Sequence, residues 1–568
     1  MATIYIDEDI GKDEPTQQGT EESPYKTLQF AYLERPAEAQ YLTRKSQSAD
    51  DEAAKEWKPA AKSALKKAAN NYEQKKKKAA RELELAAQRK RHDEERNKAL
   101  EEAKKIVIEE DTSLPAPVKI KLDEVGDHIK LRGTGESESK GTRVRVVGRV
   151  HRERKQKDML FITLRDGYGF MQVVIGGQLA KTYEAVTLTR ETTMEIYGEM
   201  YEVPAGAHAP LNRELHADFY KIPKHWRAAG GDDAITNRVQ PGAEHSTLLD
   251  LRHLTLRGEV ASSVMLVRDA VEFAFNQAYK ESRIRKVSPP ALVQTQVEGG
   301  ATLFKFDYYG ADAFLTQSSQ LYLETCLPSM GDVYCIEKSF RAEKSLTRRH
   351  LSEYTHVEAE LDFISFDDLL SHIEHMICRV LELVMADPVI AGYIKHLNPE
   401  FSVPERPFLR MKYSDAIEWL REHEILNEDG NPHAFGDDIA EAAERRMTDI
   451  INKPIFLTHF PVEIKAFYMQ RDPADPRVTE SVDCLMPGVG EIVGGSMRLD
   501  DHEALMAAFK REGLDPAPYY WYTDQRKYGS SPHGGYGLGL ERFLAWLCKQ
   551  HTVRDCCLYP RFMGRCRP

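Results

Sequence analysis

The chain has 568 residues, a formal net charge of −12 and 41% hydrophobic residues. This length predicts several domains with enough apolar content for a large core. An acidic total argues against a general polyanion binder, so any contact with nucleic acid must come from local basic patches. The 8 cysteines form no C-x-x-C pair typical of zinc or redox sites. Reduced thiols are the simplest interpretation.

The sequence contains no run of eighteen apolar residues, which excludes a membrane-spanning helix. Its first ten residues are acidic and contain no arginine, unlike a secretory signal or a mitochondrial presequence. We therefore expect a cytoplasmic protein with no membrane partner.

Residues 1–112 are predicted to form an N-terminal module with a long basic helix. A strand-like piece at 3–6 and a possible helix at 27–32 precede it. From about 51 to 107 the sequence is rich in Ala, Lys, Glu, Arg and Leu, with proline only near the start, which favours one long helix. Between residues 55 and 105 there are seventeen Lys and Arg against nine Asp and Glu. The helix is either a solvated rod with i,i+4 ion pairs or an arm that binds RNA phosphates without reading sequence.

A linker at 113–140 leads to residues 141–225, where short alternating strands separated by glycine turns predict an OB-fold barrel. The predicted strands are 143–150, 159–166, 170–175, 194–201 and 216–222. Such barrels stack single-stranded bases on exposed aromatic side chains. Phe161 is either such a platform or part of the barrel core. Residues 226–244 have the composition of a hinge.

The last predicted domain is 245–568. Its helix at 259–279 carries an apolar stripe at helical spacing. Further on, strands near 334–340 and 354–358 are joined by a basic loop that suits an anionic ligand. Arg341 and Glu343 are two residues apart, so on a strand they would share a face and could bind a phosphate and a hydrogen-bond donor together. An exposed hairpin with a solvated tip is the alternative for this stretch alone.

Residues 339–360 resemble motif 2 of the class II aminoacyl-tRNA synthetases, with Phe-Arg-x-Glu, a variable loop and an aromatic strand. Residues 535–542, Gly-Tyr-Gly-Leu-Gly-Leu-Glu-Arg, resemble motif 3, and 259–290 resemble motif 1, all in the family's order. The resemblance implies a multidomain α+β protein whose catalytic domain is an antiparallel β-sheet flanked by helices. The barrel resembles the anticodon-binding barrel of the class IIb enzymes for aspartate, asparagine and lysine.

The resemblance implies amino-acid activation, in which a carboxylate attacks the α-phosphate of ATP and pyrophosphate leaves. Catalysis of this kind depends on positioning and charge neutralisation. Catalytic roles fall to Arg341 at the α-phosphate, Glu343 at the adenine amine, and Arg542, which stacks on adenine opposite Tyr354. The full set implied to bind ATP is Arg341, Glu343, Arg349, His350, Leu351, Tyr354, Glu491, Gly539, Glu541 and Arg542.

The resemblance also implies Mg²⁺, with Glu491 and Asp483 as metal carboxylates. The aspartate enzymes usually have a serine three residues after the carboxylate at 491, as a further ligand. This chain has Gly494 there, which puts that contact in doubt.

The amino-acid pocket is predicted to take asparagine. Where the aspartate enzymes carry a lysine and then a glutamine, this chain has Leu323 and Glu324. Losing a cation and gaining an anion disfavours a carboxylate ligand and suits a carboxamide, whose NH₂ needs an acceptor. The residues implied to bind the amino acid are Glu298 and Gln320 near the ammonium, Arg498 on the side-chain oxygen, and either Glu324 or Glu353 at the amide.

Taken whole, the chain resembles the asparaginyl-tRNA synthetases of the eukaryotic cytoplasm, most specifically at 294–304, 489–498 and 519–529. The resemblance implies activation of L-asparagine, its transfer to tRNA(Asn), a homodimer formed through 259–279, and anticodon contacts by Phe161 and Gln172. Three other hypotheses stay open. They are an aspartyl-tRNA synthetase, a synthetase-like enzyme that forms free asparagine, and an RNA-binding or signalling protein with an inactive synthetase core.

Overall fold

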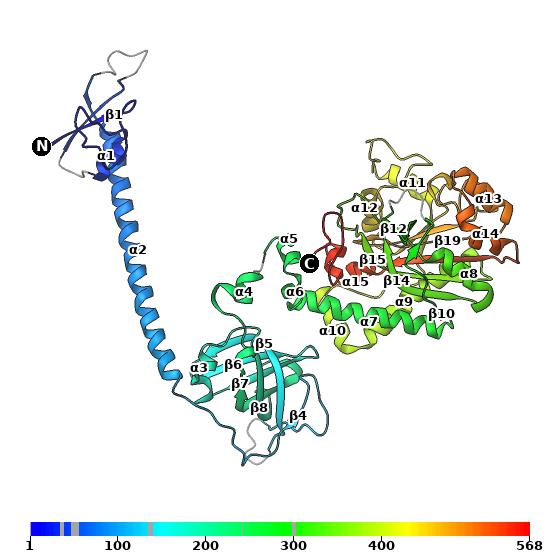
Figure 1. Cartoon of the computed structure of the whole chain (residues 1–568), viewed down its shortest axis with the longest axis horizontal. Coiled ribbons are helices and arrows are strands. Elements are labelled where there is room, and N and C mark those ends of the chain that lie inside the picture. The colour runs from blue at the N-terminus through cyan, green and yellow to red at the C-terminus, as the bar shows by residue number, and fades with distance from the viewer. Residues whose placement is uncertain (1, 35–38, 47–55, 134–139, 241, 298–302) are drawn as a thin grey trace. The chain divides into compact units, whose positions relative to one another are not determined.

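The computed structural model describes the chain except for residues 1, 35–38, 47–55, 134–139, 241 and 298–302. The chain divides into two compact units, Met1–Thr236 and Asn237–Pro568, which are described separately (Figure 1). Among the described residues, no helix has the length and apolar composition needed to cross a bilayer.

The first unit begins with a small sheet. Strand β1 (Ala2–Asp7) pairs in parallel with β2 (Ala39–Arg44), which pairs with the short β3 (Lys58–Pro59). Helix α1 (Leu28–Glu34) contributes the buried Ala31 to its core. The strand and the helix predicted near residues 3 and 27 are therefore confirmed.

The basic helix α2 runs from Lys62 to Ala103, about 63 Å at 1.5 Å per residue. The predicted start near residue 51 is wrong, because Lys58 and Pro59 pair with β2 instead, and 51–55 lie outside the described residues. The predicted end at 107 is also too late. Lys75–Lys78 are exposed, which leaves both interpretations of the helix possible.

The OB fold is a closed barrel whose strands are β5 (Arg143–Gln156), β6 (Met159–Arg165), β7 (Phe170–Ile175), β8 (Thr193–Glu202) and β9 (Arg213–Lys221). They pair in the order β5-β6-β7-β9-β8, and β5 closes the barrel by pairing with β8. The short β4 (Val118–Lys119) pairs with β5, and α3 (Tyr183–Val186) lies between β7 and β8 in the chain. The strand from 213 begins three residues before the predicted start.

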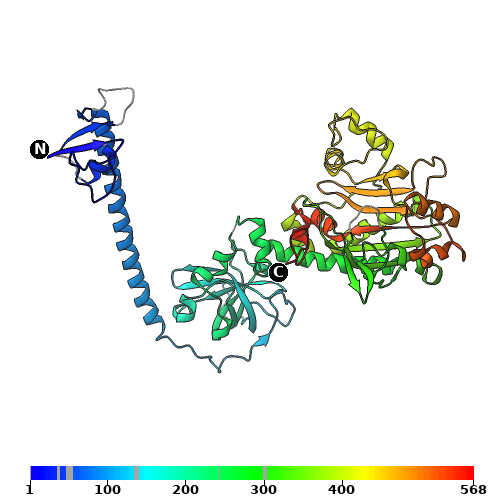
Figure 2. The same ribbon diagram turned by 45° about the horizontal axis from the view of Figure 1, so that its top comes forward.

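The second unit is built on an eight-stranded sheet that is mostly antiparallel, in the order β10-β14-β15-β20-β19-β18-β17-β16 (Figures 1 and 2). The strands are β10 (Arg285–Lys286), β14 (Val333–Phe340), β15 (Glu353–Asp362), β16 (Leu409–Lys412), β17 (Ile455–Thr458), β18 (Ser481–Met486), β19 (Gly490–Met497) and β20 (His533–Gly539). A smaller sheet holds β11 (Leu292–Val293), β13 (Ala311–Leu315) and β12 (Lys305–Tyr308).

Two helices pack their apolar sides on one face of the large sheet. Helix α7 (Glu259–Glu281) and α9 (Phe366–Ala386) share a core with Val357, Ala359 and Leu361 of β15. The other helices are α4 (Ile235–Arg238), α5 (His245–Asp250), α6 (Arg252–Thr255), α8 (Gln320–Met330), α10 (Pro388–Leu397), α11 (Tyr413–Glu422), α12 (Glu441–Ile451), α13 (His502–Arg511), α14 (Tyr520–Thr523) and α15 (Leu540–Leu547). The multidomain α+β prediction is confirmed.

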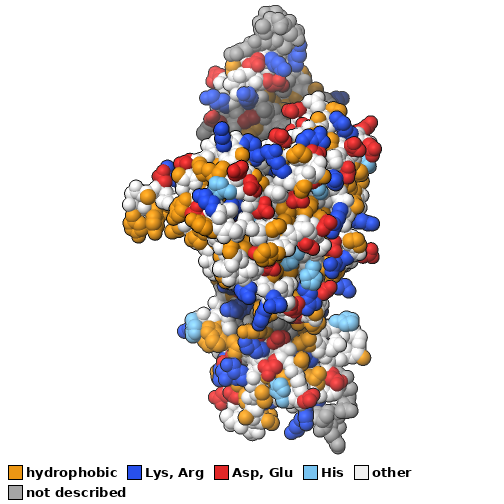
Figure 3. Space-filling model, turned by 90° about the vertical axis from the view of Figure 1, so that its right-hand side faces the viewer, with side chains coloured by type: hydrophobic (Ala, Val, Ile, Leu, Met, Phe, Trp, Pro, Cys, Tyr) orange, Lys and Arg blue, Asp and Glu red, His pale blue; other side chains and the backbone are white. Residues whose placement is uncertain are grey.

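On the face drawn in Figure 3, basic and acidic side chains lie interspersed.

Candidate functional site

The site lies on the face of the sheet opposite α7 and α9. Successive strand side chains alternate between faces, so Tyr354, His356, Glu358 and Glu360 of β15 point away from the helical core. The alternating glycines of β20 pair with these positions: Gly539 with His356, Gly537 with Glu358 and Gly535 with Glu360. A Cβ at Gly535 would lie 2.2 Å from the Glu360 carboxylate, and one at Gly537 would lie 2.1 Å from the His356 ring. The glycines therefore leave the room that the site's side chains occupy.

A cavity opens beside this face. All ten residues that the resemblance assigned to ATP line it: Arg341, Glu343, Arg349, His350, Leu351, Tyr354, Glu491, Gly539, Glu541 and Arg542. Arg341 and Glu343 lie beyond the end of β14 at Phe340, so the prediction that they share a strand face is wrong. Both still line the cavity, because the chain leaves the strand directly above it.

Arginines surround Glu491 at one side of the cavity. Arg542 Nη1 donates to Glu491 Oε2 at 2.8 Å, and Arg349 Nη2 donates to the Glu491 carbonyl at 3.3 Å. Burial opposes ionisation of the Glu491 carboxyl, but the charges of Arg542 and Arg349 outweigh it and lower its pKa to about 2. The buried Arg349 Nε has no hydrogen-bond partner, which is unusual for a protein interior and marks a donor available to a ligand.

Two further carboxylates lie next to Glu491. Glu444 of α12 accepts a hydrogen bond from the Glu491 N–H at 3.1 Å, and Lys465 binds Asp483 at 2.8 Å. Burial and the charge of Glu491 raise the pKa of Glu444 to about 7, and burial also raises the pKa of Asp483. A Cβ at Gly494 would lie 3.3 Å from the Glu491 carboxylate and 3.6 Å from that of Asp483. Glu491 and Asp483 are therefore neighbours with an open glycine between them.

These carboxylates suit a hard divalent cation. Within the described ranges, no three His, Cys, Asp or Glu side chains are arranged to hold a metal by themselves. Mg²⁺ is commonly held by one or two carboxylates together with substrate phosphates and water. Glu491 and Asp483 fit that donor set, and the serine contact of the aspartate enzymes has no counterpart at Gly494.

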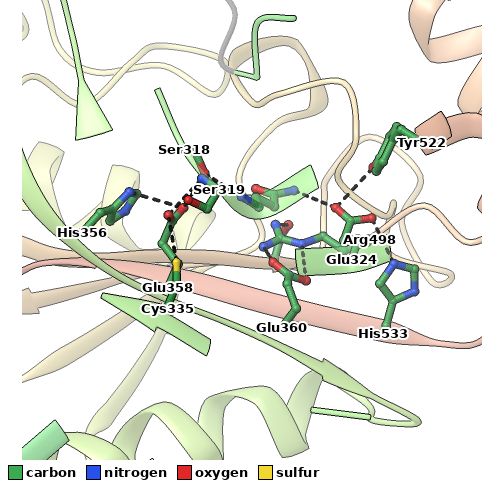
Figure 4. Close-up of polar contacts among 12 residues, drawn as sticks. Ser318, Ser319, Glu324, Cys335, His356, Glu358, Glu360, Arg498, Tyr522 and His533 are labelled. Carbon is green, nitrogen blue, oxygen red and sulfur yellow. Dashed lines mark hydrogen bonds and ion pairs between the residues drawn. The ribbon is translucent and has the colours of Figure 1, made fainter. Parts of the chain in front are cut away.

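At the other end of the strands lies a buried ion pair (Figure 4). Arg498 donates to both carboxylate oxygens of Glu360, from Nε at 3.2 Å and from Nη2, and its Nη1 donates to Ser496 Oγ at 2.7 Å. Arg498 and Glu360 are almost fully buried. Burial raises the pKa of the Glu360 carboxyl, while the two contacts with Arg498 favour its ionised form. A guanidinium has five N–H groups, so two remain for a ligand, and the carboxylate keeps spare lone pairs.

Glu324 of α8 forms a second buried cluster in the same view. Its carboxylate accepts from Arg526 Nη2 at 2.5 Å, from Gln320 Nε2 at 3.1 Å and from the Tyr522 hydroxyl at 3.3 Å. His533 lies 3.1 Å from it. Burial disfavours the charged form of Glu324, but Arg526 and His533 lower its pKa overall. Four neighbours therefore already satisfy this carboxylate.

Two positions that the sequence singled out, Glu353 and Leu323, do not join the pocket. Glu353 lies on the helical face of β15, in register with Phe340, and its carboxylate is 3.7 Å from Lys338. It therefore cannot be the amide acceptor beside Arg498. Leu323 is fully buried in an apolar cluster with Leu327. Glu298 lies outside the described residues.

The prediction missed several residues of the site. Glu360 was detectable, because it continues the alternation of Tyr354, His356 and Glu358 along one strand face. Glu444, Arg526 and His533 carry no local signal, since each comes from a distant segment.

The two residues predicted to contact the anticodon lie on the outer face of the barrel. Leu160 and Ile162, on either side of Phe161, are in the barrel core, and Phe161 itself is half-buried with Arg154 Cζ 5.3 Å from its ring. The alternative that Phe161 is core is wrong. Gln172 Nε2 donates to Glu214 at 2.8 Å.

An antiparallel sheet with a phosphate-suited cavity and a buried Arg–Glu pocket, preceded by an OB barrel, defines the architecture of a class II tRNA synthetase. Residues 244–563 match the family described as tRNA synthetases class II (D, K and N). Residues 20–115 match the N-terminal domain of asparaginyl-tRNA synthetase, and 144–223 match an OB-fold nucleic acid binding domain.

Relatives of known name span the whole chain. The cytoplasmic asparagine--tRNA ligases of Saccharomyces cerevisiae and Homo sapiens are 51% and 48% identical to it, each over 100% of both chains. The solved asparaginyl-tRNA synthetase of Entamoeba histolytica, in complex with asparaginyl-adenylate, has a TM-score of 0.72 and 43% identity, and the match covers 80% of this chain and 100% of that one. The chain belongs to the asparagine--tRNA ligase family of class II tRNA synthetases.

Proposed function

We propose that the protein is a cytoplasmic asparagine--tRNA ligase. It activates L-asparagine with ATP and transfers the asparaginyl group to the 3′ end of tRNA(Asn). The observation that carries the choice of amino acid is the buried Arg498–Glu360 pair. The class of reaction is supported by the cavity lined by Arg341, Arg349 and Arg542 and by the named relatives.

In the first step, an oxygen of the asparagine carboxylate attacks the α-phosphorus of ATP, and the bond to the leaving pyrophosphate breaks. Two anions must approach each other, so the site must neutralise charge where it develops. Arg341 meets the α-phosphate, while Arg349 and His350 meet the β- and γ-phosphates. The buried Arg349 Nε, which has no hydrogen-bond partner among the described residues, supports this assignment.

Adenine lies between Tyr354 and Arg542, and Glu343 accepts a hydrogen bond from its amine. Aromatic stacking and a cation–π contact would hold the ring. Gly539 allows the base to approach the strand, and Leu351 lines the cavity. Glu541 lines the cavity but acts indirectly, since it accepts from Arg268 Nη1 at 2.8 Å and from the Thr355 N–H at 3.0 Å.

Mg²⁺ bound with ATP at Glu491 and Asp483 would neutralise the phosphates and the leaving pyrophosphate. The Glu491 carboxylate also accepts a hydrogen bond from Arg542, so one side chain connects the metal-binding part of the site to the adenine-binding part. Lys465 fixes the orientation of Asp483.

The amino-acid side chain is selected by charge. An N–H of Arg498 donates to the carboxamide oxygen, and Glu360 accepts from the carboxamide NH₂. An aspartate carboxylate would face the Glu360 carboxylate, repel it and offer it no donor. Gln320, with Glu298, holds the substrate ammonium. Glu324 acts indirectly, since it accepts from the Gln320 amide and so sets its orientation.

In the second step, a ribose hydroxyl of the terminal adenosine of tRNA(Asn) attacks the asparaginyl carbonyl, and AMP leaves. The barrel would bind the anticodon through Phe161 and Gln172, and α2 would add phosphate contacts. We also propose a homodimer, which is supported by exposed apolar side chains on α7, Phe273 (70% exposed) and Val260 (52% exposed).

The experiment is pyrophosphate exchange into ATP without tRNA, run for each of the twenty amino acids. We expect Mg²⁺-dependent exchange with asparagine alone. Exchange with aspartate would contradict the pocket assignment, and no exchange from folded protein would contradict the ligase assignment.

A further inference from the structure

The outer face of the barrel carries a continuous set of polar and aromatic side chains across four strands. Strand pairing places Gln172 of β7 beside Glu214 of β9, which pairs in turn with Tyr201 of β8. One level away, Phe161 of β6 pairs with Val174, which pairs with His216 of β9. Directly opposed residues share a face, so the predicted anticodon residues and the pair Tyr201–His216 face the same way.

Glu214 joins these side chains into one unit. Its Oε2 accepts from Gln172 Nε2 at 2.8 Å, and its Oε1 lies 2.7 Å from His216 Nε2. Because one amide N–H is turned toward Glu214, the Gln172 carbonyl is left as an acceptor for a base edge. The same carboxylate fixes the His216 ring.

The His216 ring stacks on Tyr201. Their centroids are 4.0 Å apart and their planes differ by 17°. Arg132 Nη1 donates to the Tyr201 hydroxyl at 3.1 Å and fixes the far end of the pair. The His216 side chain is 40% exposed, whereas Arg132 Cζ lies 5.4 Å over the Tyr201 ring, so the accessible part of this preassembled aromatic surface is on the His216 side. An ordered aromatic surface loses little conformational entropy when a base stacks on it.

Phe161 and the stacked pair are too far apart to share a base. Strand β7 separates Phe161 from His216, which corresponds to two strand spacings, or roughly 10 Å. The side chain between them is the buried Val174, which leaves no third ring to bridge the gap. The spacing suits two different bases of a splayed single strand.

We propose that Tyr201 and His216 form a second base-stacking platform, which takes an anticodon-loop base other than the one on Phe161. The inference rests on the proposed binding of tRNA by this barrel. It assigns the pair to an unpaired nucleobase and gives Glu214 a role in positioning Gln172 and His216.

The test measures the Kd of a tRNA(Asn) transcript by fluorescence anisotropy for Tyr201→Leu, which keeps bulk but removes the ring. Loss of one stacked base should raise Kd roughly 5- to 150-fold, given about 1–3 kcal/mol per base. Phe161→Leu is measured in parallel. Tyr168→Leu is the matched control, because Tyr168 is an exposed tyrosine of the same barrel, 56% exposed, that contacts Lys121 instead. It should leave Kd unchanged.

Transcripts with an abasic nucleotide at each anticodon-loop position in turn locate the bases. The effect of Tyr201→Leu should vanish at one abasic position and that of Phe161→Leu at another. If both vanish at the same position, or if only Phe161→Leu weakens binding, the second platform is refuted while the proposed function stands. If neither variant weakens binding although circular dichroism shows an intact barrel, the anticodon role of the barrel fails as well.

Discussion

Replacing Glu360 by glutamine should collapse the preference for asparagine over aspartate. In the structure, Glu360 compensates the buried Arg498 through two hydrogen bonds, and the proposed carboxamide NH₂ donates to the same carboxylate. Glutamine removes the charge and turns one acceptor into a donor. The pocket then holds an uncompensated cation, which favours a carboxylate ligand.

The size of the change follows from two contributions. Asparagine loses a hydrogen bond to a charged group, about 1.5–3 kcal/mol, or roughly 10- to 150-fold in kcat/KM. Aspartate is relieved of a repulsion that at about 4 Å and an effective dielectric constant of about 20 amounts to about 4 kcal/mol. Together they predict that the ratio of kcat/KM for asparagine to that for aspartate falls by at least about 10⁴-fold.

The assay is pyrophosphate exchange with each amino acid, with melting temperatures to confirm folding. The matched control is Glu324→Gln, which neutralises the other buried carboxylate. Four neighbours already satisfy Glu324, so its loss should lower activity and stability without turning the enzyme toward aspartate. A ratio that changes less than tenfold in folded Glu360→Gln, or a switch produced by Glu324→Gln instead, would refute the assignment.

Three further predictions concern the ATP end of the site. Arg341→Ala should lower kcat for pyrophosphate exchange by about 10²–10³-fold at unchanged melting temperature, because it removes a contact to the developing charge; retained kcat would remove Arg341 from the α-phosphate. Glu491→Gln should raise KM for ATP about tenfold and weaken the Mg²⁺ dependence of ATP binding measured by calorimetry, and an unchanged dependence would exclude Glu491 as a ligand. Glu444 has a pKa of about 7 against an ordinary 4.5, so the native state binds this proton more tightly than the unfolded chain, and stability falls as pH rises between those values. Between pH 5.5 and 8 this contribution lowers the free energy of unfolding by about 2 kcal/mol, and Glu444→Gln should abolish it. Thermal unfolding at both pH values measures the difference, and an equal loss of stability in the wild type and the variant would contradict the prediction.

Sequence reasoning identified residues that line one cavity, the one proposed for ATP, because most of them lie in two short stretches. The motif between 339 and 360 and the glycine run from 535 supply most of the lining, and strand pairing brings them together. The alternation along β15 also places Glu360 on the face of the site, since the side chains at every second position of a strand share a face. The same rule excludes Glu353, which has the opposite parity.

The rest of the site could not be predicted from local pattern. Glu444 belongs to α12, and no pattern in the sequence of that helix predicts that it packs against the turn before Glu491. Three of the four partners of Glu324 come from residues 522–533, about 200 positions later. The start predicted for the basic helix is too early for a similar reason. Helix propensity is a local property and does not predict that residues 58–59 pair with a distant strand.

The two ends of the site lie on the same strand face but differ in how their arginines are partnered. At the end proposed for ATP, Arg349 keeps a buried Nε–H without a hydrogen-bond partner in the described part of the chain, which is available to an anionic ligand. Its other nitrogens lie 3.6 to 3.9 Å from carboxylates, so its charge is already partly neutralised. At the amino-acid end, Arg498 is matched by Glu360, so the pocket offers both signs but no net charge. A neutral carboxamide, which donates and accepts, can satisfy both partners, whereas a carboxylate satisfies one and repels the other. The proposed specificity for asparagine therefore depends on the Arg498–Glu360 pair, and Gly535 of β20 keeps Glu360 beside Arg498 by leaving space for its carboxylate.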